Sequence, residues 1–229
     1  MIAEKKVILV RPRSTNDDIT AHTHAWSEGV RQLFEENGWT VMDCSIEKAT
    51  RESVEEALRA WPDSLFVFYG HGDEDALIGQ GNGNDVEVCD FRNVELLGKR
   101  KAYVMACLSA RKEGLGYKAV KEHGALVYFG YINKVWGYWG NRKDKEYGGM
   151  MYALGECVNS GLRVWLAQPE LTAGEIEQKM KKVYERWIDY YTEIDDIDYL
   201  VASRFAGVLF HNMDALELWG NKQTRLYSL

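Results

Sequence analysis

Hydrophobic residues fall into two kinds of pattern along the chain. Short hydrophobic runs, each suited to one buried β-strand, lie at 7–10, 39–45, 65–69, 102–106 and 125–132. Between them, hydrophobic residues recur at every third or fourth position, as on one face of a helix, around 19–37, 50–61 and 114–123. Strands and helices that alternate at these lengths form a mainly parallel sheet with helices on both faces. The pattern therefore predicts an α/β fold with three layers, α/β/α.

Turn and capping residues mark where several elements begin or end. Asn37-Gly38 is expected to end the first helix, and Thr50 to cap the second, which Pro62 ends. The segment 76–88, "ALIGQGNGNDVEV", has the glycines and asparagines of a β-hairpin turn, and a short helix is expected near 91–97. A small hairpin is therefore predicted as an insertion beside the main sheet.

The last third of the chain is predicted to be mostly helical. Its first helix spans 147–159, closed by Ser160-Gly161, and its second begins at a capping box of Thr172 and Glu175. A third helix over 199–213 leads to a final strand at 215–220, which brings the sheet to six strands. The large hydrophobic residues on one face of the second helix indicate core packing and not a ligand site. They are Ile176, Met180, Val183, Trp187 and Tyr191.

Length, charge and cysteine content narrow the class of protein. The 229 residues suit one domain covering 1–229. A net charge of −7 argues against a nucleic-acid binder, and no apolar run reaches the length of a membrane helix, about 18 residues. The apolar core within 1–13 is too short for a secretion signal, so this segment is interpreted as leading into the first strand. The cysteines lack metal-site spacing, which predicts free thiols in a reducing cytoplasm. They are Cys44, Cys89, Cys107 and Cys157.

Two of the predicted strands end in residues that can do chemistry. In "LFVFYGHG" the strand leads into His71, and in "KAYVMACLS" it leads into Cys107. Ligands of open parallel sheets bind at the carboxyl ends of the strands, and adjacent strands lie about 4.8 Å apart. We therefore expect both side chains to face one cleft. There an imidazole can activate a thiol by favouring its thiolate and later protonate a leaving amine.

Gly72 follows the histidine and has no side chain, so its N–H can approach a bound carbonyl oxygen closely. Together with the N–H of Cys107 it can stabilise the oxyanion of a tetrahedral intermediate. Taken singly, each motif has an ordinary explanation, because a cysteine after apolar residues is often a small buried hydrophobe and His-Gly is often a turn. Their pairing at the ends of two successive buried strands favours catalysis.

The strand-end motifs resemble those of the caspase-like cysteine peptidases, in which hydrophobic strands end in His-Gly and in Ala-Cys-x-Ser. The matching stretches here are "FVFYGHG" and "YVMACLS". The stretch "EHGALVYFGYINKVW" is similar to the one that carries the fifth strand and a wall of the specificity pocket in gingipain- and CHAT-type members. "LFHNMDALELWG" resembles their closing segment, with Asn212-Met213-Asp214 where those members have a Gly-Asp-Pro-like turn.

This resemblance implies the caspase-like fold, a peptide or protein substrate, and hydrolysis through a thioester acyl-enzyme without a cofactor. By position, it implies Cys107 as the nucleophile, His71 as general base and acid, and the N–H groups of Gly72 and Cys107 as the oxyanion hole. An idle caspase-like domain that binds proteins is the alternative, and the intact Cys and His favour the enzyme. A flavodoxin-like ligand-binding domain is a third interpretation. It is disfavoured because "RPRSTNDD" follows the first strand in place of a glycine-rich phosphate loop.

The aromatic run after the fifth strand is interpreted as a substrate-binding wall, because aromatic side chains offer a peptide apolar contact area. A mobile loop with a solvated charge cluster is the alternative. The candidate contacts are Tyr131, Trp136 and Trp139.

Charged residues beside the same edge leave the preferred substrate residue open. Arg11 and Arg13 follow the first strand and would suit an acidic substrate residue. Asp17 and Asp18 come next and would suit a basic one. The sequence does not choose between these two pockets of opposite charge.

Two segments have the composition of metal sites. His22 and His24 lie close to the aspartates at 17 and 18, but histidines two positions apart on a helix point to different sides, which favours a solvated helix start. The segment 72–87 is rich in oxygen donors that suit calcium, and some caspase-like peptidases depend on calcium. It lacks the EF-hand spacing, so a hairpin turn is favoured and we predict no metal site.

Overall fold

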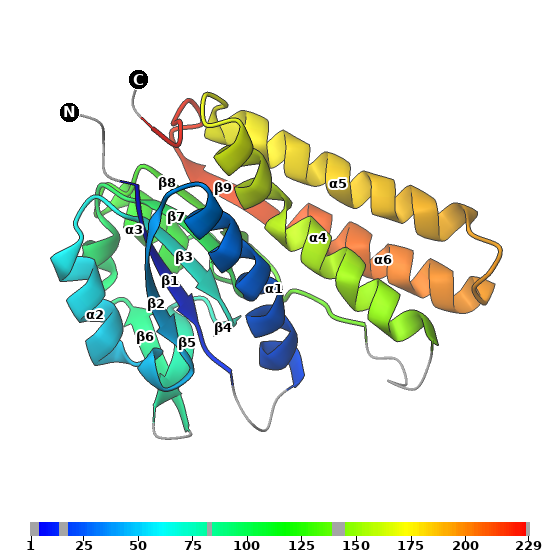
Figure 1. Cartoon of the computed structure of the whole chain (residues 1–229), viewed down its shortest axis with the longest axis horizontal. Coiled ribbons are helices and arrows are strands. Elements are labelled where there is room, and N and C mark those ends of the chain that lie inside the picture. The colour runs from blue at the N-terminus through cyan, green and yellow to red at the C-terminus, as the bar shows by residue number, and fades with distance from the viewer. Residues whose placement is uncertain (1–4, 14–17, 82–83, 139–144, 228–229) are drawn as a thin grey trace.

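The computed structural model of the protein describes residues 5–13, 18–81, 84–138 and 145–227 (Figure 1). Its main sheet has six strands in the order β2-β1-β3-β7-β8-β9, parallel except for β9, which runs antiparallel to β8. This confirms the predicted mainly parallel sheet. The strands are β1 (Lys6–Arg11), β2 (Thr40–Ser45), β3 (Leu65–Tyr69), β7 (Lys101–Met105), β8 (Val127–Tyr131) and β9 (Leu216–Gly220).

A second, antiparallel sheet follows β3. The predicted hairpin is present as β5 (Ala76–Gly81) and β6 (Asn84–Asp90). The sheet has a further short strand, β4 (His71–Gly72), which pairs with β5. The histidine at the end of β3 is therefore held in a second sheet and does not lie in a free turn.

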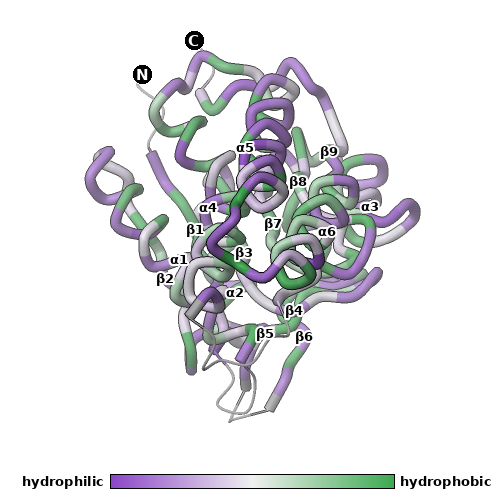
Figure 2. The backbone as a smooth tube through the Cα atoms, turned by 90° about the vertical axis from the view of Figure 1, so that its right-hand side faces the viewer, coloured by the Kyte–Doolittle hydropathy of each residue, from purple (hydrophilic) through white to green (hydrophobic). Residues whose placement is uncertain are grey.

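Helices cover both faces of the main sheet (Figure 1). Helices α1, α4 and α5 pack on one face, and α2, α3 and the β5–β6 hairpin on the other, which confirms the three-layer fold. Figure 2 shows hydrophobic residues along the central strands and hydrophilic residues on the outer turns of the helices. The helices are α1 (Asp18–Glu36), α2 (Arg51–Ala60), α3 (Leu115–Lys121), α4 (Lys145–Ala167), α5 (Ala173–Glu193) and α6 (Tyr199–Ala215). The short 3₁₀ helices are η1 (Ile46–Lys48) and η2 (Val94–Leu97).

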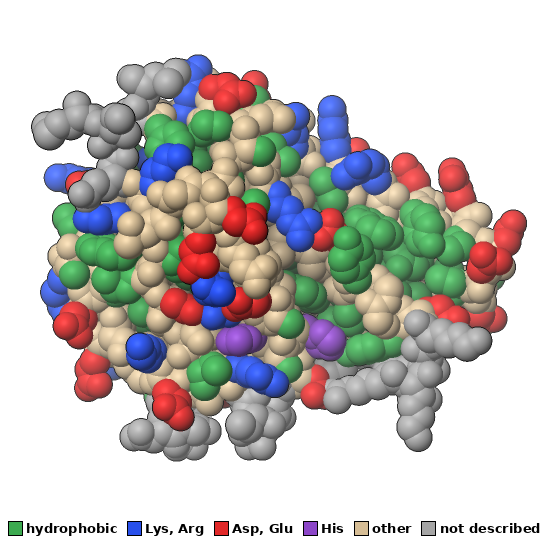
Figure 3. Space-filling view, in the orientation of Figure 1, with side chains coloured by type: hydrophobic (Ala, Val, Ile, Leu, Met, Phe, Trp, Pro, Cys, Tyr) green, Lys and Arg blue, Asp and Glu red, His purple; other side chains and the backbone are tan. Residues whose placement is uncertain are grey.

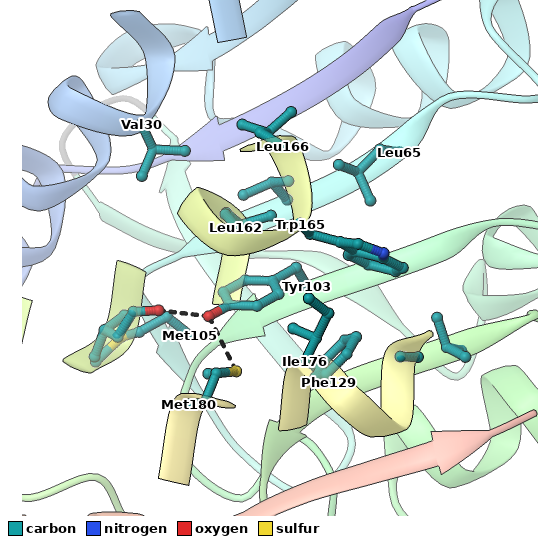
Figure 4. Close-up of a cluster of buried hydrophobic side chains, with 14 of the residues drawn as sticks. Val30, Leu65, Tyr103, Met105, Phe129, Leu162, Trp165, Leu166, Ile176 and Met180 are labelled. Carbon is teal, nitrogen blue, oxygen red and sulfur yellow. Dashed lines mark hydrogen bonds between the residues drawn. The ribbon is translucent and has the colours of Figure 1, made fainter. Parts of the chain in front are cut away.

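Tyr103 of β7 lies at the centre of the layer between the sheet and α4 and α5 (Figure 4). Its hydroxyl donates to the Val158 carbonyl at 2.5 Å and lies 3.5 Å from the Met180 sulfur. The prediction that Ser160-Gly161 closes the first helix of the last third is wrong, because α4 continues to Ala167. A Cβ at Gly161 would lie 2.7 Å from the Tyr103 hydroxyl, so this glycine permits a close crossing inside the helix.

Helices α4, α5 and α6 extend beyond the sheet and share a hydrophobic core of their own (Figure 1). The hydrophobic residues predicted on one face of α5 divide between the core at the sheet and the core of the helical extension. Ile176 and Met180 face the sheet, whereas Trp187 is partly exposed in the extension. Figure 3 shows hydrophobic side chains at the surface over α4 and α5, where Tyr152 and Tyr190 are exposed. Within the described residues, none of the helices combines the length and apolarity that crossing a membrane demands.

Candidate active site

The register of the main sheet brings the two strand-end motifs together. β3 and β7 are neighbours, and Tyr69 lies opposite Met105. His71 and Cys107 each lie two residues beyond these partners, past the ends of β3 and β7. Both line one pocket at this edge of the sheet. The expectation that they share a cleft therefore agrees with their placement.

Cys107 rests in a partly buried environment. The Val135 N–H donates to its Sγ at 3.3 Å. Burial raises the pKa of the thiol, and the bond from Val135 and the Lys134 ammonium only partly oppose this effect. A raised pKa favours the protonated form of the thiol at neutral pH. Desolvation is the largest influence on this pKa, and the expectation that His71 favours the thiolate stays a prediction.

The chain turns sharply after the cysteine. Leu108 has a φ of 57°, a left-handed conformation that costs free energy for a leucine. Two backbone bonds hold the turn against the end of β8: Leu108 N–H donates to the Asn133 carbonyl at 3.1 Å, and Ala110 N–H to the Tyr131 carbonyl at 3.1 Å. The neighbouring strand thus stabilises a strained backbone that presents the thiol.

Gly72 lies against the cysteine-bearing segment. A Cβ there would be 2.8 Å from the Ala106 Cβ and 3.1 Å from the Cys107 carbonyl oxygen, so a side chain would force the two segments apart. Asp73 N–H donates to the Ala76 carbonyl at 2.8 Å. Because hydrogen-bonded and non-bonded pairs alternate in an antiparallel ladder, Gly72 and its partner Leu77 form a non-bonded pair. The β4–β5 ladder therefore leaves the Gly72 N–H unused and directed away from β5.

The loops after β4 and β7 are tied to each other. Arg111 pairs with Glu74, and Leu115 N–H donates to the Glu74 carbonyl at 2.7 Å. These contacts join the segment that follows His71 to the segment that follows Cys107. The segments that carry His71 and Cys107 are thereby joined to each other.

The rim of the pocket is anchored to α6. The Asn212 side chain accepts from the Trp136 N–H at 2.8 Å and donates to the Trp136 carbonyl at 2.8 Å. The Trp136 ring stacks on His211 with centroids 3.7 Å apart, and His211 Nε2 lies 2.8 Å from the Lys134 carbonyl. Trp136 remains 49% exposed and lines the pocket, and its role as a substrate wall stays a prediction.

Sequence reasoning missed Asn212 as an anchor. The resemblance suggests a turn at Asn212-Met213-Asp214, but these residues belong to α6, which passes directly into β9. A fully buried asparagine on a helix needs partners for its amide, and the backbone of Trp136 supplies them. The departure from the family pattern was the signal that could have drawn attention to this position.

The remaining walls of the pocket come from two helices, and sequence reasoning missed them because their spacing is that of ordinary core positions. His22 also contacts the Tyr147 hydroxyl at 2.9 Å, and burial lowers the pKa of His22, which favours the neutral ring. Burial likewise lowers the pKa of His24, which lies near Arg11. Within the described residues, no three His, Cys, Asp or Glu side chains converge as a metal site requires. The helical lining residues are Ile19, His22 and Trp26 from α1, and Met151, Leu154 and Val158 from α4.

The charged residues predicted to select substrate lie elsewhere. Arg11 is only 5% exposed, and its guanidinium donates to Asp43 at 2.6 and 2.8 Å and to Glu28 at 2.6 Å. Arg13 is exposed, with its backbone N–H bonded to Gln80 Oε1 at 3.2 Å. Asp18 is exposed in the first turn of α1. None of these three side chains lines the pocket as the described residues form it.

The remaining predicted substrate contacts are Tyr131, Asp17 and Trp139. Tyr131 is 2% exposed, and its hydroxyl lies 3.1 Å from that of Tyr184, so it is a core residue and the expectation that it contacts substrate does not fit its position. It is buried because it lies on the face of β8 that meets the helices. Asp17 and Trp139 lie outside the described residues.

The six-stranded sheet, the small antiparallel sheet and the helices on both faces define the caspase-like α/β fold. Among solved structures, the chain is similar to the Arg-specific cysteine proteinase gingipain R, with a TM-score of 0.59 and 12% identity over 97% of this chain. It covers 47% of that chain, about half of its length. No protein-family model matches the sequence, and neither does any curated protein. The caspase-like fold that the strand-end motifs implied is thus confirmed.

Proposed function

We propose that the protein is a cysteine endopeptidase with Cys107 as nucleophile and His71 as general base and acid. The observation that carries this proposal is the placement of both side chains on one pocket, each two residues past a register partner at the carboxyl edge of the sheet. The fold shared with a cysteine proteinase adds support at the level of architecture. The compartment we propose is the cytoplasm, and the substrate a peptide or protein.

The first step is the attack of Cys107 on the peptide bond. His71 takes the thiol proton as Sγ of Cys107 attacks the peptide carbonyl carbon, and the resulting oxyanion accepts hydrogen bonds from the N–H groups of Gly72 and Cys107. The intermediate collapses as the C–N bond breaks and the His71 imidazolium protonates the leaving amine. Water then attacks the thioester with His71 again as base, which releases the carboxylic acid and restores the thiol.

One observation favours the alternative, an idle domain that binds proteins. Burial raises the pKa of the Cys107 thiol, as it does for inert cysteines. Selective alkylation of Cys107 does not decide between the two, because the other three cysteines are buried and would react slowly in either case. Hydrolysis itself has to be measured.

The test is a screen of fluorogenic peptides that vary the residue before the scissile bond, run on wild type, Cys107→Ala and Cys44→Ala. Cys44 is a buried free cysteine of β2 that does not line the pocket, so its replacement removes the same sulfur from a distant position. We expect Cys107→Ala to abolish hydrolysis at a stability cost within about 1 kcal/mol, and Cys44→Ala to keep it. Wild-type turnover by Cys107→Ala would refute the mechanism. A folded wild type that cleaves no peptide would favour the idle domain.

A further inference from the structure

We propose that the pocket beside Cys107 binds the substrate residue that precedes the scissile bond, and that it selects a long uncharged side chain, leucine or methionine, over arginine, lysine or aspartate. This inference rests on the proposed peptidase function and adds the substrate class. It leaves aside both of the charged pockets that the sequence kept open.

Covalent geometry assigns the pocket to that residue. In the acyl-enzyme, the carbonyl carbon is bonded to Sγ of Cys107, and the Cα of the residue before the scissile bond is the next atom along the chain. Its side chain therefore begins within two bonds of the thioester carbon. The cavity that has both Cys107 and His71 in its wall is the one this side chain enters.

Two helical faces and a strand end bound the cavity. Ile19 and Trp26 of α1 face Met151 and Leu154 of α4, and Met105 closes the β7 side. The helices meet closely here, because a Cβ at position 155 would lie 2.5 Å from the Trp26 ring and a glycine stands there. The indole is thus seated on the backbone of α4, which gives the pocket a fixed aromatic wall.

The described lining of this cavity carries no Asp, Glu, Lys or Arg side chain. Among these described lining residues, a guanidinium or carboxylate would meet no side chain of opposite charge, and a charge that loses its water without such a partner costs several kcal/mol. A pocket that selects arginine needs a carboxylate for its guanidinium. The nearby Glu28 does not serve, because it already accepts bonds from Arg11 and Arg31.

The chemistry of the lining matches a flexible aliphatic side chain. Methionines at 105 and 151 adapt to the shape of an apolar guest, and the aromatic ring of Trp26 offers a flat contact surface. One ring nitrogen of His22, Nε2, lies 2.9 Å from the Tyr147 hydroxyl. Leucine and methionine fill such a space without leaving a buried polar group unpaired.

Matched tripeptide chloromethyl ketones that differ only in the last residue test the inference on the whole protein. We expect those ending in Leu or Met to alkylate Cys107, followed by intact mass, at least about 10²-fold faster than those ending in Arg, Lys or Asp. If the Arg, Lys or Asp probe reacts as fast as the Leu probe, the specificity is wrong and the peptidase function stands. If no probe reacts faster with wild type than with His71→Ala, the peptidase function itself fails.

A pair of variants localises the preference. Met151 lines the pocket and Tyr152, the next residue of α4, is 60% exposed outside it, so Met151→Asp and Tyr152→Asp add the same charge to the same helix. We expect Met151→Asp to raise the Arg-to-Leu rate ratio at least about 10-fold and Tyr152→Asp to leave it unchanged. Equal shifts in both variants, or none in Met151→Asp, would overturn the assignment.

Met151→Phe tests the same pocket if the Met151→Asp variant does not fold. It keeps the position apolar and fills the cavity, so it should slow the Leu and Met probes at least about 10-fold and spare a probe ending in Ala. Uniform slowing of all probes, or no slowing, contradicts the proposal.

Discussion

Two neighbouring regions at the carboxyl edge of the sheet differ in whether charged side chains are buried there. At the end of β1, Arg11 is buried between Asp43 and Glu28, and Glu28 also accepts from Arg31. At the ends of β3 and β7, the pocket beside Cys107 has an apolar lining. Both regions border α1. A charged residue near this edge in the sequence, such as Arg11, is therefore not available to a ligand when β2 and α1 supply its partners.

The paired state of Arg11 follows from its surroundings. Burial would lower the pKa of its guanidinium, but the hydrogen bonds and charges of Asp43 and Glu28 outweigh this effect and raise it. The side chain thus stays charged and engaged. Its role is to hold β1, β2 and α1 together, and the predictions below separate that role from catalysis.

The largest effect is expected at Gly72, in the apolar region. Gly72→Ala places a Cβ 2.8 Å from that of Ala106 and would displace the N–H that we propose for the oxyanion hole, so kcat should fall about 10²-fold with little change in KM. Gly207→Ala is the control, because a Cβ at that position meets nothing within 4 Å. An unchanged kcat in Gly72→Ala would remove this residue from the oxyanion hole.

The next effect concerns the charged region. Arg11→Met should lower the free energy of unfolding by about 2 kcal/mol at pH 7, because Asp43 and Glu28 lose a charged donor while remaining partly exposed. The rate ratio between Leu and Arg probes should stay the same. A changed ratio would show that Arg11 reaches the substrate.

Glu28 contributes to the pH dependence of that loss. Bonds from Arg31 and Arg11 outweigh burial and lower the pKa of Glu28 to about 2. A carboxylate with a depressed folded-state pKa stabilises the fold above its unfolded pKa of about 4.3, and this stability is lost as pH falls toward the folded value. The difference between wild type and Arg11→Met, measured by urea unfolding, should therefore shrink between pH 4.3 and about 2. A constant difference would exclude Glu28 as the partner that matters.

The sequence predicted the framework of this edge better than its side-chain contacts. Strand runs and helix caps depend on local patterns, and the two motifs at the ends of β3 and β7 could be placed together because parallel strands end at one edge. The pairing of Arg11 depends on Asp43 and Glu28 from other elements, and the burial of Tyr131 on Tyr184, far along the chain. Such contacts have no local signature.

A smaller effect is expected at the rim of the pocket. Asn212→Ala removes both hydrogen bonds to the Trp136 backbone, so the rim should loosen and kcat/KM for peptides should fall about 10-fold or less. Asn221→Ala is a matched control on a surface turn, where the side chain accepts from the Gln223 N–H at 3.0 Å. If both variants match wild type, the anchoring of Trp136 to α6 does not contribute to substrate binding.

The smallest effect is expected in the reaction of the resting thiol with iodoacetamide. Because burial raises the pKa of Cys107, its alkylation by iodoacetamide should keep accelerating above the ordinary thiol value of about 8.5, and His71→Ala should change this profile little. With a peptide chloromethyl ketone, whose binding brings an electrophile to the pair, His71→Ala should slow the reaction strongly because the proton acceptor is gone. Mass spectrometry assigns the label to Cys107. A wild-type profile with its midpoint below 8.5 that His71→Ala moves upward would instead show a thiolate–imidazolium pair in the free protein, and burial would no longer be the dominant influence on this thiol.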